Sequence, residues 1–372
     1  MWTFLRIFVS KTTIMDKEFE DITAPLFAAD GPGATVMVAH GDEVVFGREY
    51  GLESFETGVR VGPETRFNIC SVSKQFSALA LLKLQEQGLL SLDDTVSAHF
   101  PEYRSPLLRR ITLRQLMSHT SGIPDIRPRT EAEWRSYRSK YASKYVSLTD
   151  YKLYSLWEES CRYLDGLETL AFEPGTRYEY QNPTFQLVLP IVERATGVPF
   201  VRWMHENFFA PAGMTHTSYL DPENPVLPRQ ARGYEMRDGK WRLSDYGTAN
   251  FFPTKADGGI YTTAADFHRY VRALFGGRLV TEASLHQAVT PLVVTDLPHT
   301  GYGLGLFVED RPGHPRKIFH TGDNGGFFAY EGYYPDSDVF YCVFAARADW
   351  SREATADAID GVLDRHGLLL RP

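Results

Sequence analysis

A run of helix-forming, almost entirely apolar residues at 75–84 constrains the fold of this chain more than any other feature. The run follows Ser71-Val72-Ser73-Lys74 and ends before Gly88, a residue type that commonly terminates helices. A helix that is apolar on most of its faces has to be buried inside a domain. The sequence therefore predicts a central buried helix whose first turn carries a serine and a lysine.

Ser71 and Lys74 form the chain's single Ser-x-x-Lys pattern, and residues three apart share one face of a helix. We expect burial to disfavour the charged form of the Lys74 amine and so to lower its pKa. An amine that shares a proton with a neighbouring serine is one way to make a nucleophile. The helix N-terminus would also favour developing negative charge. On this pattern alone, a surface helix with a chance Ser-x-x-Lys is an equal alternative.

Two further patterns follow in order along the chain. Tyr180-Gln181-Asn182 is the only Tyr-x-Asn, and His320-Thr321-Gly322 follows a short strand-like run at 317–319. Ser-x-x-Lys, Tyr-x-Asn and a basic or polar residue before Thr-Gly resemble the serine β-lactamase and penicillin-binding protein superfamily. The Tyr-x-Asn version is similar to its class C β-lactamase branch, which includes esterases, DD-peptidases and D-aminopeptidases.

The resemblance covers nearly the whole chain. It extends through family-like segments at 67–69, 92–94, 119–124, 212–214, 258–263, 301–305 and 326–327. It implies an α+β fold (an α/β sandwich), in which an antiparallel sheet is flanked by helices and carries a large, mostly helical insertion.

Local patterns agree with this organisation. Strand signals occur at 34–38, 44–46, 304–308, 317–320, 328–334 and 339–345, and a helix is expected from about 352 to 365. We therefore expect a discontinuous sheet domain at 18–90 and 255–372, with a helical insertion domain at 91–254. Residues 1–17 form an N-terminal extension.

The resemblance implies roles for the site residues. Ser71 attacks a carbonyl carbon, Lys74 takes or relays its proton, and Tyr180 hydrogen-bonds the Ser71 hydroxyl. Lys74 and Tyr180 would titrate as a pair, so the formal base stays open between them. Asn182 would orient a substrate amide or the Lys74 amine.

His320-Thr321-Gly322, the third pattern along the chain, would complete the substrate side of the site. The backbone N–H groups of Ser71 and of Asp323, which directly follows His320-Thr321-Gly322, are expected to bind the oxyanion. Tyr246 and Phe251, in a loop before Gly258, are expected to line the site. The aromatic residues between 134 and 163 have helical spacing, which more often indicates packing.

His320 departs from the pattern of the resembled β-lactamases, which usually carry lysine there. A histidine is neutral for much of the time at pH 7, so it would hold a β-lactam carboxylate weakly and would add an ionisation near neutrality to the pH–rate profile. This favours the esterase and peptidase members. The alternative is a histidine that merely hydrogen-bonds a strand end.

Composition narrows the class of protein further. The net charge of −8, with acidic and basic residues interleaved, argues against nucleic-acid binding, and no apolar run approaches the length of a membrane span. The eleven histidines show no metal-binding spacing, so no metal and no cofactor are predicted. Three cysteines imply no disulfide framework.

The start resembles a weak signal peptide, with Met15 as an alternative start. A cytoplasmic location is favoured and a periplasmic one stays open.

Together these features predict a serine hydrolase that acts through an acyl-enzyme on Ser71. Its substrate would be a small ester, amide or peptide, with ester hydrolysis or acyl transfer first. A DD-peptidase or D-aminopeptidase comes second and a β-lactamase third. From a different class, the chain is a non-catalytic sensor or scaffold that kept the fold.

Overall fold

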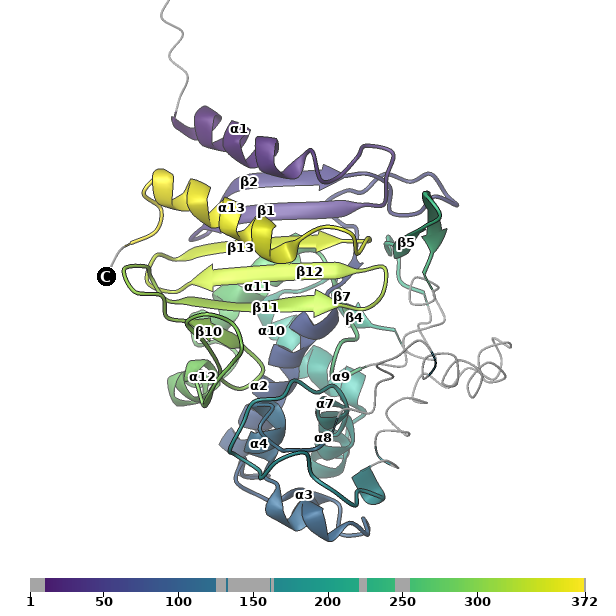
Figure 1. Ribbon diagram of the computed structural model, residues 1–372, viewed down its shortest axis with the longest axis vertical. Coiled ribbons are helices and arrows are strands. Elements are labelled where there is room, and N and C mark those ends of the chain that lie inside the picture. The colour runs from purple at the N-terminus through teal and green to yellow at the C-terminus, as the bar shows by residue number, and fades with distance from the viewer. Residues whose placement is uncertain are drawn as a thin grey trace, which may run out of the picture.

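The structure is a computed structural model that describes residues 11–124, 132, 161, 164–220, 226–244 and 255–370 of the 372-residue chain. An eight-stranded antiparallel sheet forms its larger lobe, in the order β2-β1-β13-β12-β11-β10-β9-β8 (Figure 1). Its strands are β1 (Ala34–His40), β2 (Glu43–Tyr50), β8 (Val293–Val294), β9 (Thr300–Tyr302), β10 (Phe307–Glu309), β11 (Lys317–Asp323), β12 (Phe328–Tyr334) and β13 (Val339–Ala345). The predicted α+β fold with an antiparallel sheet is confirmed.

The first and last long strands of the sheet are neighbours. β1 pairs with β13 in antiparallel register from Ala34 opposite Ala345 to His40 opposite Val339. The N-terminal hairpin β1–β2 is thus joined to the C-terminal strands, as a discontinuous sheet domain requires. The helix α1 (Lys11–Thr23) begins within the expected N-terminal extension and belongs to this lobe.

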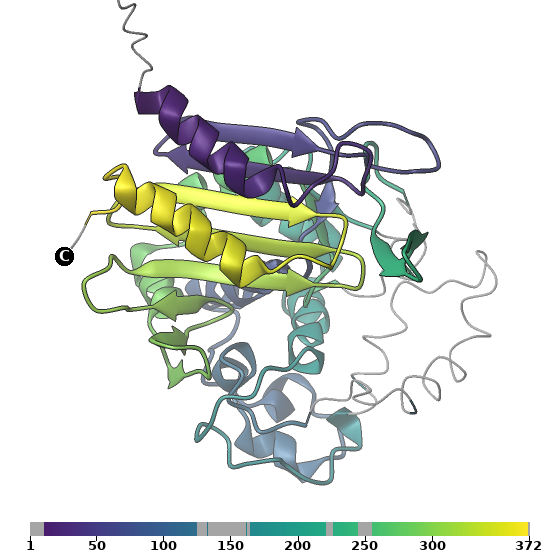
Figure 2. The same cartoon turned by 45° about the horizontal axis from the view of Figure 1, so that its top comes forward.

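Both faces of the sheet are covered, and β13 divides its side chains between two cores. Phe340, Cys342 and Phe344 face a core that includes α2 (Lys74–Glu86) and α11 (Ala264–Phe275). Tyr341 and Val343 face a second core, closed by α1 and α13 (Arg352–Arg365), which lie side by side in Figure 2. All seven residues of β13 are buried, as expected for a strand covered on both faces.

The smaller lobe is built from short helices and loops. It contains α3 (Val96–His99), the 3-10 turn η2 (Pro106–Arg110), α4 (Leu113–Met117), α7 (Pro183–Gln186), α8 (Val188–Thr196), α9 (Phe200–Met204), the π-helical turn η4 (His205–Phe209) and α10 (Ala210–Ala212). Between the lobes lies a small sheet of β3 (Phe67–Asn68), β7 (Ile260–Thr262) and β4 (Ser218–Tyr219). The remaining described elements are the 3-10 turn η1 (Cys70–Ser73), the hairpin of β5 (Tyr234–Arg237) and β6 (Lys240–Leu243), and α12 (Glu282–Val289). None of the described helices is both long and apolar enough to cross a bilayer.

The helix α2 is the predicted central helix. Its residues from Lys74 to Leu82 are all buried, and it ends at Glu86, two residues before Gly88. Gly88 adopts a positive φ of 70°, the left-handed conformation that glycine tolerates at a helix end. The prediction of a buried helix that starts at the Ser-x-x-Lys pattern is therefore confirmed.

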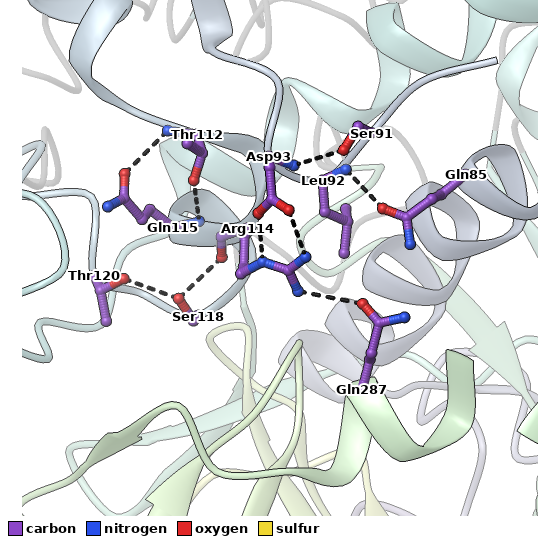
Figure 3. A network of polar contacts seen from close by, with 10 residues as sticks. All are labelled: Gln85, Ser91, Leu92, Asp93, Thr112, Arg114, Gln115, Ser118, Thr120 and Gln287. Atoms are coloured by element: carbon purple, nitrogen blue, oxygen red, sulfur yellow. Dashed lines mark hydrogen bonds and ion pairs between the residues drawn. The ribbon is translucent and has the colours of Figure 1, made fainter. Parts of the chain in front are cut away.

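A polar network fixes the helical lobe against the far end of α2 (Figure 3). Arg114 of α4 forms an ion pair with Asp93 and donates to Gln287 of α12, while the Leu92 N–H donates to Gln85 of α2. Ser91, Thr112, Gln115, Ser118 and Thr120 complete the network. Because Ser118 and Thr120 flank His119, the network also fixes the turn that reaches the site described below.

A second, fully buried network lies between α2 and the sheet. Gln75 Nε2 donates to Glu331 Oε1 of β12 over 3.1 Å, and the Tyr270 hydroxyl of α11 donates to Gln75 Oε1 over 3.0 Å. Burial raises the pKa of Glu331 from 4.5 to about 8, because a charged carboxylate is poorly solvated in this position. Glu331 is therefore a neutral carboxylic acid at pH 7.

We expect Glu331→Gln to remove a pH dependence from stability. Between pH 4.5 and about 8 the folded protein holds a proton at Glu331 that the unfolded chain has lost. The free energy of unfolding should therefore fall as pH rises through this window, by about 1.4 kcal/mol per pH unit from this group. In urea unfolding from pH 5 to 8, the free energy of unfolding of the variant should rise relative to that of the wild type as pH rises.

Glu353→Gln is the matched control for this measurement, because the Glu353 side chain is 63% exposed. It should follow the wild type across the range. Parallel pH dependence in Glu331→Gln and wild type would show that Glu331 is ionised in the folded protein.

Candidate active site

The nucleophile candidate lies where the small sheet meets the central helix. Ser71 belongs to η1, which leads directly into α2, and Cys70 before it has a positive φ of 53°. This conformation is unfavourable for a residue with a Cβ and turns the chain sharply between β3 and the helix. Lys74 Nζ lies 3.1 Å from Ser71 Oγ, so the structure brings the Ser-x-x-Lys pair together.

Lys74 is fully buried, and three oxygen atoms lie within hydrogen-bond distance of its Nζ. Besides Ser71 Oγ, its Nζ donates to Asn182 Oδ1 over 2.7 Å and to the backbone C=O of Asp257 over 2.7 Å. The Lys74 amine is therefore fixed within hydrogen-bond distance of the serine oxygen.

Tyr180 and Asn182 reach the pair from the helical lobe. The Tyr180 ring centroid lies 5.0 Å from Lys74 Nζ, and Asn182 directly precedes the short helix α7. The Tyr180–Asn182 segment is held by the turn at His119, whose Nδ1 accepts from the Gln181 N–H over 3.1 Å. The His119 ring also lies 4.3 Å from the Tyr180 ring. The three predicted residues are thus gathered around Lys74, and the hydrogen bond from Tyr180 to Ser71 stays a prediction.

The third pattern lies on β11, which passes directly beside η1. A Cβ added at Gly322 would lie 2.5 Å from the carbonyl oxygen of Ile69 and 2.8 Å from Cys70 Cβ. Only glycine therefore lets the end of the strand come this close to the nucleophile turn. Asp323 follows at the end of β11, and its side chain is exposed. The oxyanion roles of the Ser71 and Asp323 N–H groups stay a prediction.

His320 is fully buried, and both of its ring nitrogens are engaged inside the protein. Nδ1 lies 2.6 Å from the Thr321 carbonyl oxygen, and Nε2 lies 3.0 Å from the Tyr302 hydroxyl. Because a carbonyl can only accept, Nδ1 carries the hydrogen and Nε2 accepts from Tyr302. Burial raises the pKa of Tyr302, which keeps this phenol protonated.

Burial and the nearby Lys74 charge lower the pKa of His320 from 6.5 to about 3. The expectation that His320 ionises near neutrality is therefore wrong. The sequence identified a histidine in the third pattern, but the enclosure that keeps the ring neutral comes from distant segments. His320 is a neutral residue throughout the pH range in which most enzymes work.

Two predicted lining residues, Tyr246 and Phe251, lie outside the described residues, as do the aromatic residues Trp134, Tyr137, Tyr141, Tyr145, Trp157 and Tyr163. Within the described part of the chain, no group of three or more His, Cys, Asp or Glu side chains is placed to hold a metal ion.

Sequence patterns missed one part of the site, a row of three consecutive carbonyl groups. Ser77 Oγ donates to Ala256 O, Lys74 Nζ to Asp257 O, and Asn324 Nδ2 to Gly258 O over 2.9 Å. This row runs along η1 and the first turn of α2. A backbone acceptor has no side-chain signature, so only the glycine pair at 258–259 marked this segment in the sequence.

Comparison with known protein families gives one match over most of the chain. A family model described as Beta-lactamase matches residues 19–364. Penicillin-binding protein 4* of Bacillus subtilis is 26% identical over 304 residues, which cover 79% of this chain and 63% of that protein. Protein flp of Staphylococcus aureus is 30% identical over 210 residues, which cover 55% of this chain and 38% of that protein. The chain thus spans less than two thirds of the length of either relative.

Solved structures share the fold. The octameric penicillin-binding protein homologue from Pyrococcus abyssi has a TM-score of 0.75 at 23% identity and covers 95% of this chain and 76% of its own. A class C beta-lactamase has a TM-score of 0.71 at 20% identity, and the match covers 95% of this chain and 97% of that structure's chain. D-amino acid amidase from Ochrobactrum anthropi has a TM-score of 0.72 at 21% identity, and the match covers 95% of this chain and 98% of the amidase chain. At such identities the likeness shows the fold alone.

Proposed function

Because this chain belongs to the beta-lactamase family, a family of serine hydrolases, we propose that it hydrolyses or transfers a small acyl group through an ester formed on Ser71. One observation carries this proposal. Lys74 Nζ lies 3.1 Å from Ser71 Oγ and is fixed there by Asn182 and by the Asp257 carbonyl. An amine held beside a serine oxygen can take or relay the hydroxyl proton as that oxygen becomes a nucleophile.

The proposed reaction has two halves. In the first, Ser71 Oγ bonds to the carbonyl carbon, the bond to the leaving group breaks, and the serine proton passes through the Lys74–Tyr180 pair to the leaving group. In the second, water or another alcohol attacks the acyl-enzyme and gives its proton to the same pair, which returns it to Ser71. The oxyanion formed in each half would be bound by the Ser71 and Asp323 N–H groups.

The neutral state of His320 favours esters over carboxylate-bearing β-lactams. Its two nitrogens are occupied by Thr321 and Tyr302, and its pKa of about 3 leaves no charge there at neutral pH. A permanent cation at this point would attract a substrate carboxylate, and His320 does not supply one. We therefore place ester hydrolysis or acyl transfer first.

Amide or D-amino-peptide hydrolysis is the second candidate, favoured by the orientation of Asn182. Its Oδ1 accepts from Lys74, so its amide nitrogen is the group available to donate to a substrate carbonyl. That contact suits a peptide-like substrate, and a β-lactamase activity comes third.

A substrate panel tests the proposal. Purified wild type should cleave p-nitrophenyl acetate and butyrate faster than nitrocefin or D-amino acid p-nitroanilides, and a fluorophosphonate should add its mass to Ser71. If nitrocefin is the fastest substrate, the charge argument fails and the β-lactamase activity moves to first place. If no substrate is turned over and Ser71 takes up no fluorophosphonate, the chain is a scaffold that kept the fold.

Within this panel, His320→Lys should lower the KM for nitrocefin by about tenfold, because a charged donor to a carboxylate contributes more than a neutral one. The gain should shrink as salt is added, since screening weakens the attraction. His320→Gln is the matched control, because it offers a donor and an acceptor without a charge. An equal gain in both variants would show that space rather than charge limits β-lactam binding.

A further inference from the structure

Two asparagine side chains join the segment before the nucleophile to the segment after the third pattern. Asn68, fully buried on β3, lies three residues before Ser71, and Asn324 directly follows Asp323. Asn324 Nδ2 donates to Asn68 Oδ1 over 2.8 Å and to the carbonyl oxygen of Gly258 over 2.9 Å. Asn68 Nδ2 donates to the same Gly258 oxygen over 3.3 Å. Three segments that are distant in sequence therefore meet at this amide pair.

Backbone partners fix the orientation of both amides. The Cys70 N–H donates to Asn68 Oδ1 over 3.0 Å, so that atom has to be oxygen. Asn324 Nδ2 faces the Gly258 carbonyl oxygen, so it has to be nitrogen. Turning either amide over would place two acceptors or two donors against each other. The pair therefore has one hydrogen-bonding arrangement.

On the nucleophile side, Asn68 holds the strained turn before Ser71. Its Oδ1 binds the N–H of Cys70, the residue with φ of 53°, and the next N–H along the chain is that of Ser71. A residue with a Cβ keeps this conformation only when its surroundings impose it. The hydrogen bond from Asn68 is one such constraint, and it acts one peptide unit from the first expected oxyanion donor.

On the strand side, Asn324 holds the end of β11. It is adjacent to Asp323, whose N–H is the second expected oxyanion donor. Gly322 already brings this strand against Ile69 and Cys70 at distances that exclude a side chain. The Asn68–Asn324 hydrogen bond thus ties the two backbone segments together immediately beside both donors.

We propose that Asn68 and Asn324 are positioning residues that set the separation of the Ser71 and Asp323 N–H groups. The proposal rests on the proposed function, because it needs acyl transfer through Ser71. An oxyanion is stabilised only when both donors lie within hydrogen-bond distance of the position it occupies in the transition state. A donor displaced by about 1 Å costs about a hundredfold in rate.

Two isosteric variants separate this role from a merely structural one. Asn324→Asp replaces an amide that donates twice by a carboxyl that faces two acceptors, so the link between the segments is lost. Asn68→Asp keeps the oxygen that binds Cys70 and Asn324, and it loses the two long hydrogen bonds that Asn68 Nδ2 donates to the carbonyl oxygens of Gly258, over 3.3 Å, and Ile260, over 3.4 Å. We expect Asn324→Asp to lower kcat for p-nitrophenyl acetate by about 10- to 100-fold, with KM changed less than about threefold. Asn68→Asp should lower kcat less than about fivefold.

A structural role predicts the opposite order. Asn68 is fully buried, whereas Asn324 is half-buried, so a new carboxyl group destabilises the fold more at position 68. The melting temperature should therefore fall more in Asn68→Asp, while kcat falls more in Asn324→Asp. The rate of Ser71 phosphonylation by a fluorophosphonate, followed by intact mass, should fall in parallel with kcat, because this reaction also develops charge in the oxyanion site.

The double variant Asn68→Ala/Asn324→Ala should be no slower than the slower of its two single variants, because each single substitution already breaks the hydrogen bond between Asn324 and Asn68. The inference is overturned if kcat and the phosphonylation rate stay at the wild-type level while the melting temperature falls, or if Asn68→Asp is the slower isosteric variant. A wild type that is itself not phosphonylated would overturn the proposed function, a result distinct from either of these.

Discussion

Replacement of Ser71 by alanine is expected to lower kcat for activated esters by roughly four to six powers of ten. Loss of a covalent nucleophile removes the acyl-enzyme route altogether, and neighbouring groups retain only the catalysis that binding and oxyanion donors supply. The fold should survive, because the Ser71 hydroxyl is half-buried and Lys74 keeps its hydrogen bonds to Asn182 and Asp257. Initial rates, a circular dichroism spectrum and the intact mass after fluorophosphonate treatment test this together.

Ser97→Ala is the matched control for this variant. Ser97 is half-buried like Ser71 and lies on α3 in the helical lobe, so its loss should leave kcat at the wild-type level. Activity of more than a few per cent in Ser71→Ala would mean that another residue carries the acyl group.

Lys74→Ala and Tyr180→Phe should each lower kcat by about a thousandfold or more, and the double variant should be little slower than either. Lys74 Nζ contacts Ser71 Oγ and lies 5.0 Å from the Tyr180 ring, so we expect both side chains to serve one proton path. Residues that act as a unit lose most of their effect with the first substitution. Single-turnover and steady-state rates of the four proteins give the coupling directly.

Lys74→Met separates chemistry from packing in this experiment. Lys74 is fully buried, so alanine also leaves a cavity, whereas methionine fills much of the same volume without a charge. Equal rate losses in both variants assign the effect to the Lys74 amine. Fully additive losses for Lys74 and Tyr180 would show that they act in separate steps.

The elements of the fold that depend on local pattern were predictable. The strand signals at 328–334 and 339–345 coincide with β12 and β13, and the helix expected at 352–365 is α13. The strand predicted at 304–308 begins three residues later than expected, because β10 spans Phe307–Glu309. Gly305, at φ of 74°, turns the chain so closely past α2 that a Cβ would lie 2.8 Å from the Lys74 carbonyl oxygen. That constraint comes from a helix more than two hundred residues away in sequence.

The site shows the same division between local and distant determinants. Ser71 and Lys74 lie together because their spacing along one helix dictates it. The neutral state of His320 depends on burial by Tyr302 and on the charge of Lys74, which no local pattern encodes. The Asp257 carbonyl was missed for a related reason, because its role is set by tertiary approach rather than by the type of its side chain.

The pairing of β1 with β13 also determines when the protein can finish folding during synthesis. The hairpin of residues 34–50 emerges from the ribosome some three hundred residues before its partner strand at 339–345. Until then the hairpin carries an open edge, and the helix α2 lacks the sheet that buries it. Contacts that close over some three hundred residues form slowly. The growing chain is therefore exposed to aggregation until β13 has been translated, and the sheet encloses Ser71 and Lys74 only after that.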